Sequence, residues 1–145
     1  MHLYLPDESA TQKLGEKLAA IARPGDVLLL EGPLGAGKSC LSRAFIRSLM
    51  QDPRLVVPSP TFTLVQNYET PAGLEIWHYD LWRLDGPDAL AELGWDEALA
   101  GIVLVEWPER LAELTPPDAW RLRFSTSGLG RDVFLSGALR GFDAR

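Results

Sequence analysis

One continuous segment, VLLLEGPLGAGKS at residues 27–39, constrains the fold of this chain more than any other part of its sequence. Its first four residues are apolar, which is typical of a parallel strand that is buried on both faces. The glycines, lysine and serine that follow have the spacing of a phosphate-binding loop, which joins a strand to the next helix. The segment therefore predicts a strand, a glycine-rich turn and a helix in direct succession. The positions that match the loop pattern are Gly32, Gly37, Lys38 and Ser39.

The residue types in this turn suit a bound phosphate chain. Glycines allow the backbone to curl so that successive N–H groups point toward phosphate oxygens. The N-terminus of the following helix adds positive charge, Lys38 is able to reach the β- and γ-phosphates, and the Ser39 hydroxyl is a ligand for Mg²⁺. The alternative is an ordinary strand–helix turn with an incidental lysine. We predict nucleotide contacts at Gly32, Leu34, Gly35, Ala36, Gly37, Lys38, Ser39 and Cys40.

The rest of the chain predicts an α/β fold in which residues 1–145 form a single P-loop NTPase-like domain. A helix is expected where Ser9 and Gln12 have the spacing of a capping box, and a broken helical segment is expected at 85–100. We expect a central parallel sheet flanked by helices, with antiparallel strands added at its edges. Strands are predicted at 2–5, 27–30, 74–82 and 101–107, at the end of an extended segment at 56–69, and in a hairpin formed by 119–125 and 131–137.

Composition excludes several other classes of protein. At 145 residues and 16.0 kDa, the chain is long enough to bury a core. Its net charge of -6 argues against strong direct binding to nucleic acid, because Lys and Arg side chains supply most of that affinity. The single cysteine, Cys40, is unable to form an internal disulfide or a multi-cysteine zinc site. The first ten residues do not have the pattern of a secretion signal, and no apolar run approaches the roughly 20 residues that span a bilayer, so we expect no membrane contact and a cytoplasmic protein.

Two acidic residues end predicted strands, at the edge where open α/β sheets bind ligands. Glu106 follows the apolar run 102–105 and is predicted to bind Mg²⁺ together with the serine of the turn; the alternative is an exposed acid in the helix after Pro108. Asp80 is predicted either to hold a metal-bound water or to orient the water that attacks the nucleotide. An ion pair with Arg83 is the alternative for Asp80.

The segment PSPTF at residues 58–62 is a candidate sensor of the γ-phosphate. Its prolines hold the chain extended, and Thr61 offers a hydroxyl to a terminal phosphate or to its Mg²⁺. A plain entry into an edge strand is an equally open interpretation. The predicted catalytic set consists of Lys38, Thr61 and Asp80.

The identity of the nucleotide follows by elimination. The guanine-reading pattern Asn-Lys-x-Asp is absent, since the only asparagine is Asn67, and ATP is therefore favoured. Arg131 and Thr11 are candidate contacts to the nucleotide, with ordinary surface positions as the alternative. Trp107 is expected near the nucleotide or at a partner contact. His78 is interpreted as an ordinary strand histidine or as a residue that orients the adjoining loop.

Four motifs in this order, GPLGAGKS, VPSPTFTLVQNY, HYDLWRL and VEWPER, resemble those of the TsaE (YjeE) family over nearly the whole chain. Members of that family are bacterial P-loop ATPases required for threonylcarbamoyladenosine, a modification of the tRNA adenosine beside the anticodon. The resemblance implies an ATPase that acts on TsaD and its partner TsaB, and that resets their complex between turnovers. Two positions depart from the family pattern: Ser39 stands where threonine is common, and Trp82 stands where tyrosine is usual.

The resemblance also implies a role for each matching residue. Lys38 is expected to contact phosphate, Ser39 and Glu106 to hold Mg²⁺, and Asp80 to assist hydrolysis. Thr61 falls in the switch-like segment. Trp107 belongs to the Glu-Trp motif, and Thr11 and Arg131 match positions that touch the nucleotide.

Two alternative functions remain open at this point. A small-molecule P-loop kinase requires an acceptor pocket and usually an arginine-bearing lid, but the arginines of this chain are dispersed. A non-catalytic nucleotide-sensing adaptor binds ATP or ADP without useful turnover. For the ATPase we expect slow hydrolysis by the isolated chain, because only Arg83 is a candidate for an arginine finger near the site.

Overall fold

A computed structural model describes residues 1–137 and residue 142 of the chain. Within these residues, seven strands form one sheet in the order β1-β7-β6-β2-β5-β4-β3. The central strands β6, β2, β5 and β4 run parallel, whereas β3 pairs antiparallel with β4, and β7 pairs antiparallel with both β6 and β1. The expected α/β class, with a parallel centre and antiparallel strands toward its edges, is confirmed. The strands are β1 (His2–Leu5), β2 (Val27–Glu31), β3 (Val65–Glu69), β4 (Glu75–Asp80), β5 (Ile102–Glu106), β6 (Trp120–Ser127) and β7 (Gly130–Ser136).

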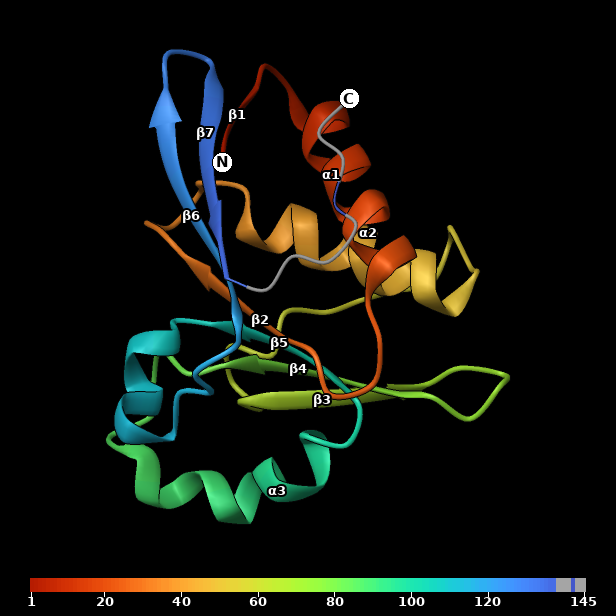
Figure 1. Cartoon of the computed structure of the whole chain (residues 1–145), viewed down its shortest axis with the longest axis vertical. Coiled ribbons are helices and arrows are strands. Elements are labelled where there is room, and N and C mark those ends of the chain that lie inside the picture. The colour runs from red at the N-terminus through yellow and green to blue at the C-terminus, as the bar shows by residue number, and fades with distance from the viewer. Residues whose placement is uncertain (138–141, 143–145) are drawn as a thin grey trace.

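Helices cover both faces of the sheet (Figure 1). Two long helices pack on one face, and three short helices pack on the other. The expected break in the helical segment at 85–100 is confirmed, because Gly94 takes a left-handed conformation between two of the short helices. None of the helices in the described ranges is both long enough and apolar enough to cross a bilayer. The helices are α1 (Glu8–Ile21), α2 (Lys38–Met50), η1 (Pro87–Leu93), α3 (Trp95–Ala98) and η2 (Pro108–Leu114).

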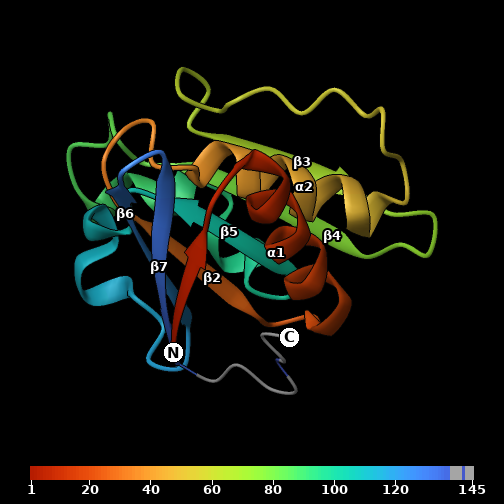
Figure 2. The same cartoon turned by 90° about the horizontal axis from the view of Figure 1, so that it is seen from above.

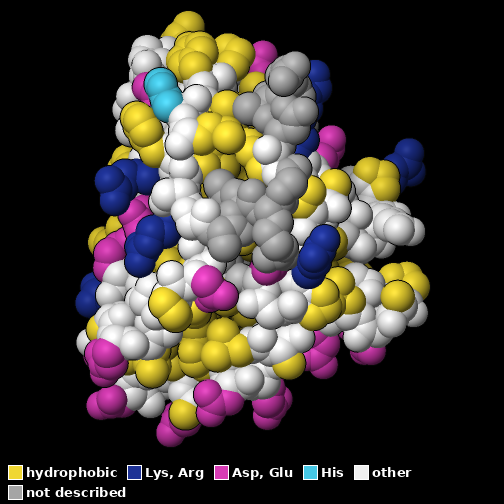
Figure 3. Space-filling model, in the orientation of Figure 1, with side chains coloured by type: hydrophobic (Ala, Val, Ile, Leu, Met, Phe, Trp, Pro, Cys, Tyr) yellow, Lys and Arg dark blue, Asp and Glu magenta, His cyan; other side chains and the backbone are white. Residues whose placement is uncertain are grey.

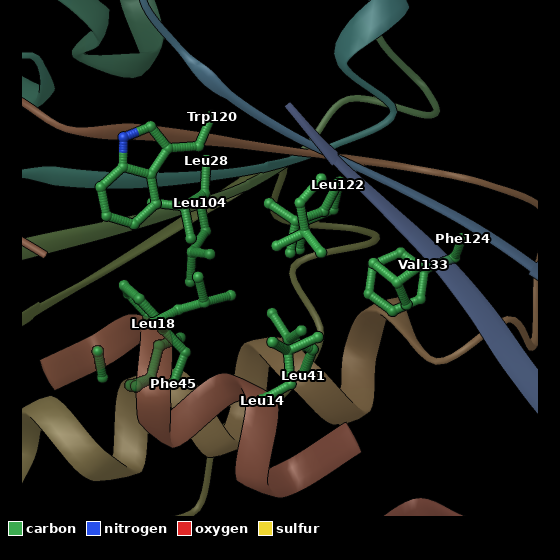
Figure 4. Packing of buried hydrophobic residues seen from close by; sticks show 14 of the residues in the cluster. Leu14, Leu18, Leu28, Leu41, Phe45, Leu104, Trp120, Leu122, Phe124 and Val133 are labelled. Atoms are coloured by element: carbon green, nitrogen blue, oxygen red, sulfur yellow. The ribbon is translucent and has the colours of Figure 1, made fainter. Parts of the chain in front are cut away.

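The apolar core is divided between the two faces of the sheet because side chains alternate along each strand. In β2 and β5, Leu28 and Leu104 point toward α1 and α2, whereas Leu29 and Val103 point toward the short helices. The first four residues of both strands are therefore apolar without interruption, as the sequence predicted. Figure 4 shows the side of the long helices, where Leu14, Leu18, Leu41 and Phe45 face Leu28, Leu104, Trp120 and Leu122 of the sheet.

The start of α1 differs from the sequence prediction. The capping residue is Asp7, whose side chain accepts a hydrogen bond of 2.9 Å from the N–H of Ala10. Ser9, which the capping-box spacing indicated, already lies inside the helix. Asp7 has an extended backbone directly after Pro6, and aspartate caps a helix as well as serine does, so the helix begins earlier than predicted.

The segment between α2 and β3 determines what lies at the carboxyl ends of the parallel strands. It leaves the C-terminal end of α2 and runs back along the outside of the molecule to β3 (Figure 2). In doing so it brings Thr61 within 3.1 Å of Asp80, the last residue of β4. The segment contains neither helix nor strand before β3, but residues 61–64 form a turn in which the N–H of Leu64 donates to the backbone oxygen of Pro60 at 2.7 Å, so the prediction of an extended chain up to the strand is wrong for these residues.

Candidate functional site

The register of the parallel strands brings the two predicted acids together. Asp80 of β4 lies opposite Glu106 of β5, and Glu106 also lies opposite Leu30 of β2. Glu106 follows Leu104 by two positions, so its side chain points to the face that α2 covers. Asp80 points to the same face for the same reason. Glu106 is buried within β5, so the alternative of an exposed acid in the following helix is wrong.

The glycine-rich turn between β2 and α2 requires glycine at two positions. Gly32 has a φ of 138°, and a Cβ atom there would lie 2.6 Å from the backbone oxygen of Phe124 in β6. Gly37 has a φ of 108° and precedes the first residue of α2, where no side chain caps the helix. The turn therefore passes closely over β6, and the first N–H groups of α2 carry no side-chain acceptor.

Lys38 begins α2 and is buried. Its Nζ donates a hydrogen bond of 2.6 Å to the backbone oxygen of Gly32, and it lies 3.8 Å from the centre of the Trp107 ring. Burial lowers the pKa of Lys38, while the nearby carboxylates of Glu106, Glu109 and Asp80 act in the opposite direction. The ammonium is thus held against the turn at a cost in desolvation that an anionic ligand would offset.

Trp107 occupies an unusual position beside this lysine. Its φ of 59° is uncommon for a bulky residue, and conformations of this kind recur at functional sites. The ring lies between Lys38 and Trp82, with 4.4 Å between the centres of the two tryptophan rings. Trp107 is therefore a wall of the site, as its place after Glu106 suggested.

The carboxylate of Glu106 has a separate partner for each oxygen. The hydroxyl of Ser39 donates to Oε1 at 3.5 Å, and Nε2 of His78 lies 2.7 Å from Oε2. Ser39 stands one residue into α2, and His78 lies on β4, two residues before Asp80. The two predicted metal ligands, Ser39 and Glu106, are thus in contact.

Asp80 is held by the segment that precedes β3. The hydroxyl of Thr61 donates to Oδ2 of Asp80 at 3.1 Å, and the backbone N–H of Trp82 donates to Oδ1 at 3.1 Å. In the described part of the chain Asp80 forms no ion pair with Arg83, whose guanidinium instead lies 5.2 Å from the centre of the Phe62 ring. The ion-pair alternative for Asp80 is therefore wrong.

A cavity of about 470 Å³ joins these groups. It lies where the turn, the ends of the parallel strands and the tip of the β6–β7 hairpin meet. Most of the site residues predicted from the sequence line it. They are Thr11, Leu34, Gly35, Gly37, Lys38, Ser39, Cys40, Thr61, Asp80, Glu106, Trp107 and Arg131.

Two of the predicted nucleotide contacts do not line the cavity. Gly32 instead accepts the hydrogen bond from Lys38. Ala36 has a fully buried side chain, and its N–H donates to the backbone oxygen of Pro33 at 3.3 Å. Cys40 does line the cavity, but burial raises the pKa of its thiol, so the reactive thiolate form is disfavoured at neutral pH.

The far end of the cavity is formed by α1 and β7. Thr11 of α1 donates its hydroxyl to the backbone oxygen of Asp7 at 3.4 Å. The guanidinium of Arg131 donates to the backbone oxygen of Gly35 at 2.9 Å and so connects β7 to the glycine-rich turn. Residues from the two ends of the chain therefore meet the turn at a single cavity.

Several residues of the site were not predicted from the sequence. Ser59 lines the cavity, and its hydroxyl lies 2.8 Å from that of Thr61. The two residues are separated by one position in PSPTF, a spacing that could have indicated this contact. The spacing of two residues places His78 on the same strand face as Asp80, but its bond to Glu106 of β5 depends on which strands are neighbours and had no signal in the sequence. Residues from distant segments also had no signal. They are Leu5, Asp7, Glu8, Leu129 and Gly130.

The oxygen atoms of this site suit a magnesium ion bound together with a phosphate ligand. Among the residues that the structure describes, no three His, Cys, Asp or Glu side chains are grouped so as to hold a metal ion by themselves. Mg²⁺ typically takes one or two protein oxygens and completes its shell with substrate phosphates and water. Ser39 and Glu106 fit that requirement.

Comparison with known proteins gives a consistent result. The family described as "Threonylcarbamoyl adenosine biosynthesis protein TsaE" matches residues 5–133. The chain is similar to the tRNA threonylcarbamoyladenosine biosynthesis protein TsaE of Rickettsia felis, with 44% identity over 79% of this chain and 67% of that protein. The protein of the same name from Bacillus subtilis is 36% identical over 85% of this chain and 75% of its own length. The chain spans about two thirds of the length of the Rickettsia felis and Rickettsia conorii relatives, at 67% and 65%.

A solved structure has the same fold. The crystal structure of Bacillus subtilis YdiB superimposes with a TM-score of 0.76 and 29% sequence identity, covering 97% of this chain and 87% of the other. The match of the family over most of the sequence, the identity to its members and the shared fold agree. The chain belongs to the TsaE family.

Proposed function

We propose that this chain is a P-loop ATPase, which binds ATP with Mg²⁺ in the cavity at the end of the parallel strands and hydrolyses it slowly on its own. We also propose that it supports threonylcarbamoyladenosine biosynthesis in tRNA through partner proteins of the TsaD and TsaB type. The proposal is carried by one observation. Lys38, Ser39, Asp80 and Glu106 converge from α2, β4 and β5 on one cavity of about 470 Å³, a size suited to a small-molecule ligand.

The phosphate chain is bound by the turn and by the start of α2. The N–H groups at the N-terminus of this helix have no side-chain cap and are available to phosphate oxygens. Lys38 now donates to a neutral carbonyl oxygen, and a phosphate oxygen would replace that bond with a stronger, charge-assisted one. Binding of an anion therefore relieves the desolvation of the lysine.

The divalent cation is held by Ser39 and Glu106, whose oxygens are already in contact. When bound, Mg²⁺ neutralises negative charge on the β- and γ-phosphates. The protein supplies few ligands of its own here, which fits a cation that arrives with the nucleotide.

Hydrolysis depends on Asp80 and Thr61. Thr61 now occupies one oxygen of the Asp80 carboxylate. When the Thr61 hydroxyl turns to a terminal phosphate, that carboxylate oxygen is free to accept a hydrogen bond from the attacking water. Among the residues that the structure describes, Arg131 is the one arginine that lines the cavity, and it bonds to the turn, so we expect the positive charge of an arginine finger to come from a partner. Such a group accelerates hydrolysis about 10³–10⁵-fold, which is why we expect slow turnover by the chain alone.

The charge distribution supports a role through protein partners. The chain carries a net charge of -6, and residues 84–109 contain no lysine or arginine. Acidic side chains gather over the layer of η1 and α3, at the lower end of the view in Figure 3. A surface of this sign repels the phosphate backbone of tRNA, so contact with the RNA is assigned to the partners.

Calorimetry and partner-dependent turnover test the proposal. We expect heat of binding for ATP in the presence of Mg²⁺, slow release of phosphate by the isolated chain, and acceleration when TsaD and TsaB proteins are added. Absence of binding to ATP would overturn the proposal. Binding without turnover in either condition would favour the nucleotide-sensing adaptor, and phosphate transfer to an added nucleoside or sugar would favour the kinase.

A further inference from the structure

The chain contains two histidines, and both bond to a carboxylate at the same distance. Nε2 of His2 lies 2.7 Å from Asp132 on the exposed β1–β7 edge, and Nε2 of His78 lies 2.7 Å from Glu106 inside the site. The side chains of the first pair are 52% and 23% exposed, and those of the second pair are 2% and 5% exposed. The same contact is thus made once in water and once in the interior.

We propose that His78 is a positioning residue, which orients the Glu106 carboxylate and thereby raises the affinity of the site for its divalent cation. The inference rests on the proposed function, because the cation site is itself part of that proposal. His78 touches neither nucleotide nor cation, and it acts through Glu106.

The geometry of the Glu106 carboxylate leads to this inference. Oε2 accepts the hydrogen bond from His78 at 2.7 Å, while Oε1 faces the Ser39 hydroxyl at 3.5 Å. With one oxygen held by the histidine, rotation of the carboxylate is restricted and the other oxygen is directed toward the serine. Partners of this kind orient metal ligands in proteins, and their removal typically lowers metal affinity about 10- to 100-fold.

The remaining nitrogen of the ring narrows the possible roles of His78. Nδ1 is buried and has no hydrogen-bond partner among the described residues. The bond to Glu106 is therefore the only polar contact that the structure gives this ring, so a substitution at His78 removes one identifiable interaction.

A purely structural role is the competing interpretation. The bond between His78 and Glu106 links β4 to β5, but these strands are already paired along five positions from Ile76↔Ile102 to Asp80↔Glu106. A buried pair as a whole is a weak source of net stability, but removal of one partner leaves the other buried and uncompensated, so folding of each variant has to be measured. The strands do not need this bond for their pairing, which leaves the orientation of the carboxylate as its distinctive effect.

The test compares His78→Leu, His78→Asn and His78→Gln with the parent chain. Glutamine carries an amide N–H about as far from the backbone as Nε2, whereas asparagine is one methylene shorter and leucine has no donor. Affinity for Mn²⁺ is measured by electron paramagnetic resonance in the presence of ADP. Affinity for ADP is measured separately in EDTA, and far-UV circular dichroism reports whether each variant is folded.

We expect His78→Leu and His78→Asn to lower Mn²⁺ affinity about 10- to 100-fold while metal-free ADP affinity changes less than about twofold. His78→Gln is expected to restore most of the Mn²⁺ affinity. The matched control, His2→Leu, removes the other histidine–carboxylate bond and should leave both affinities unchanged. Two short or apolar variants are used so that the test does not depend on one of them folding.

The proposal is overturned if the folded variants bind Mn²⁺ as the parent does, if metal-free ADP affinity falls by the same factor, or if glutamine restores nothing. It is also overturned if neither His78→Leu nor His78→Asn folds while His78→Gln retains parental Mn²⁺ affinity. The hydrogen bond at this position is then needed for folding. A parent chain that binds neither ADP nor Mn²⁺ would instead defeat the proposed function, so the two failures are distinguishable.

Discussion

The two faces of the parallel sheet differ most where its strands end. Seven polar or charged residues are buried in the described part of the chain, and six of them lie in α1, in α2 or on the face of β4 and β5 that α2 covers. On the opposite face, the neighbouring positions of the same strands are Tyr79 and Val105, which pack with Trp95 and the short helices. The hydroxyl of Tyr79 on that face donates to the backbone oxygen of Leu93 at 2.9 Å.

At the ends of β4 and β5, the side chains on one face stabilise the fold and those on the other face form the candidate site. Alternation sends Trp77 and Tyr79 of β4 to the layer of the short helices, and His78 and Asp80 to the face that α2 covers, where Asp80 lines the cavity and His78 contacts Glu106. Both faces bury apolar side chains, which stabilise the fold, and at the strand ends the face of the short helices continues this apolar layer with Tyr79 and Val105. The other face holds a desolvated lysine and two buried acids, which are a weak source of stability and are explained by a ligand. Three substitutions and one pH dependence test this division.

The largest effect is expected on the apolar face. Trp95→Ala removes a side chain that packs edge-on against Tyr79, with 5.3 Å between ring centres. We expect the free energy of unfolding to fall by about 3–5 kcal/mol, as for other buried aromatic residues. Denaturant unfolding measures this loss. Under conditions where the variant is folded, ATP affinity should equal that of the parent; a large loss of affinity would contradict the separation of the two faces.

The next largest effect is expected on the rate of ATP hydrolysis. Asp80→Asn keeps the shape of the side chain but removes its charge, so binding of ATP should be retained while phosphate release falls about 100-fold. Calorimetry and steady-state phosphate release, with partners present, separate the two quantities. If Asp80→Asn hydrolyses ATP as fast as the parent, the assignment of Asp80 is wrong.

A comparable effect on binding is expected at Lys38. Lys38→Met keeps most of the apolar stem and removes the ammonium, and we expect ATP affinity to fall about 10- to 100-fold, the range for loss of a hydrogen bond to a charged group. The free energy of unfolding of the ligand-free chain should stay the same or rise, because burial of the ammonium is unfavourable. Marked destabilisation would show that Lys38 supports the fold.

The smallest effect is a dependence of stability on pH. Burial lowers the pKa of Lys38 below 10.5, so the unfolded chain binds more protons than the folded chain between the lowered value and 10.5. The free energy of unfolding of the parent should therefore rise with pH in this window, relative to that of Lys38→Met. Denaturant unfolding of both chains across the window measures the difference; a difference that falls with pH would contradict this sign.

Much of the fold could be predicted because local patterns agreed with the tertiary arrangement. The runs at 27–30 and 102–105 are apolar at every position, and both strands proved to be covered on both faces. The start of α1 was less predictable, since Asp7 and Ser9 are both good capping residues and the choice depends on how the chain leaves β1.

The parts of the site that consist of short contiguous motifs could be predicted from the sequence. The glycine-rich turn, Asp80 and Glu106 could be named because each stands at the end of a predicted strand. The bond from His78 to Glu106 and the contact of Arg131 with Gly35 could not be named, because both depend on which strands are neighbours and in what register.

The amino-acid sequence by itself determined the order of elements, the apolar character of the central strands and the residue types of the turn. These are short-range properties, since backbone preference and side-chain periodicity act over a few residues. The tertiary structure alone decided which side chains meet at the cavity. Strand order and register bring together residues that are far apart along the chain. No local sequence pattern specifies which of these distant residues become neighbours in space.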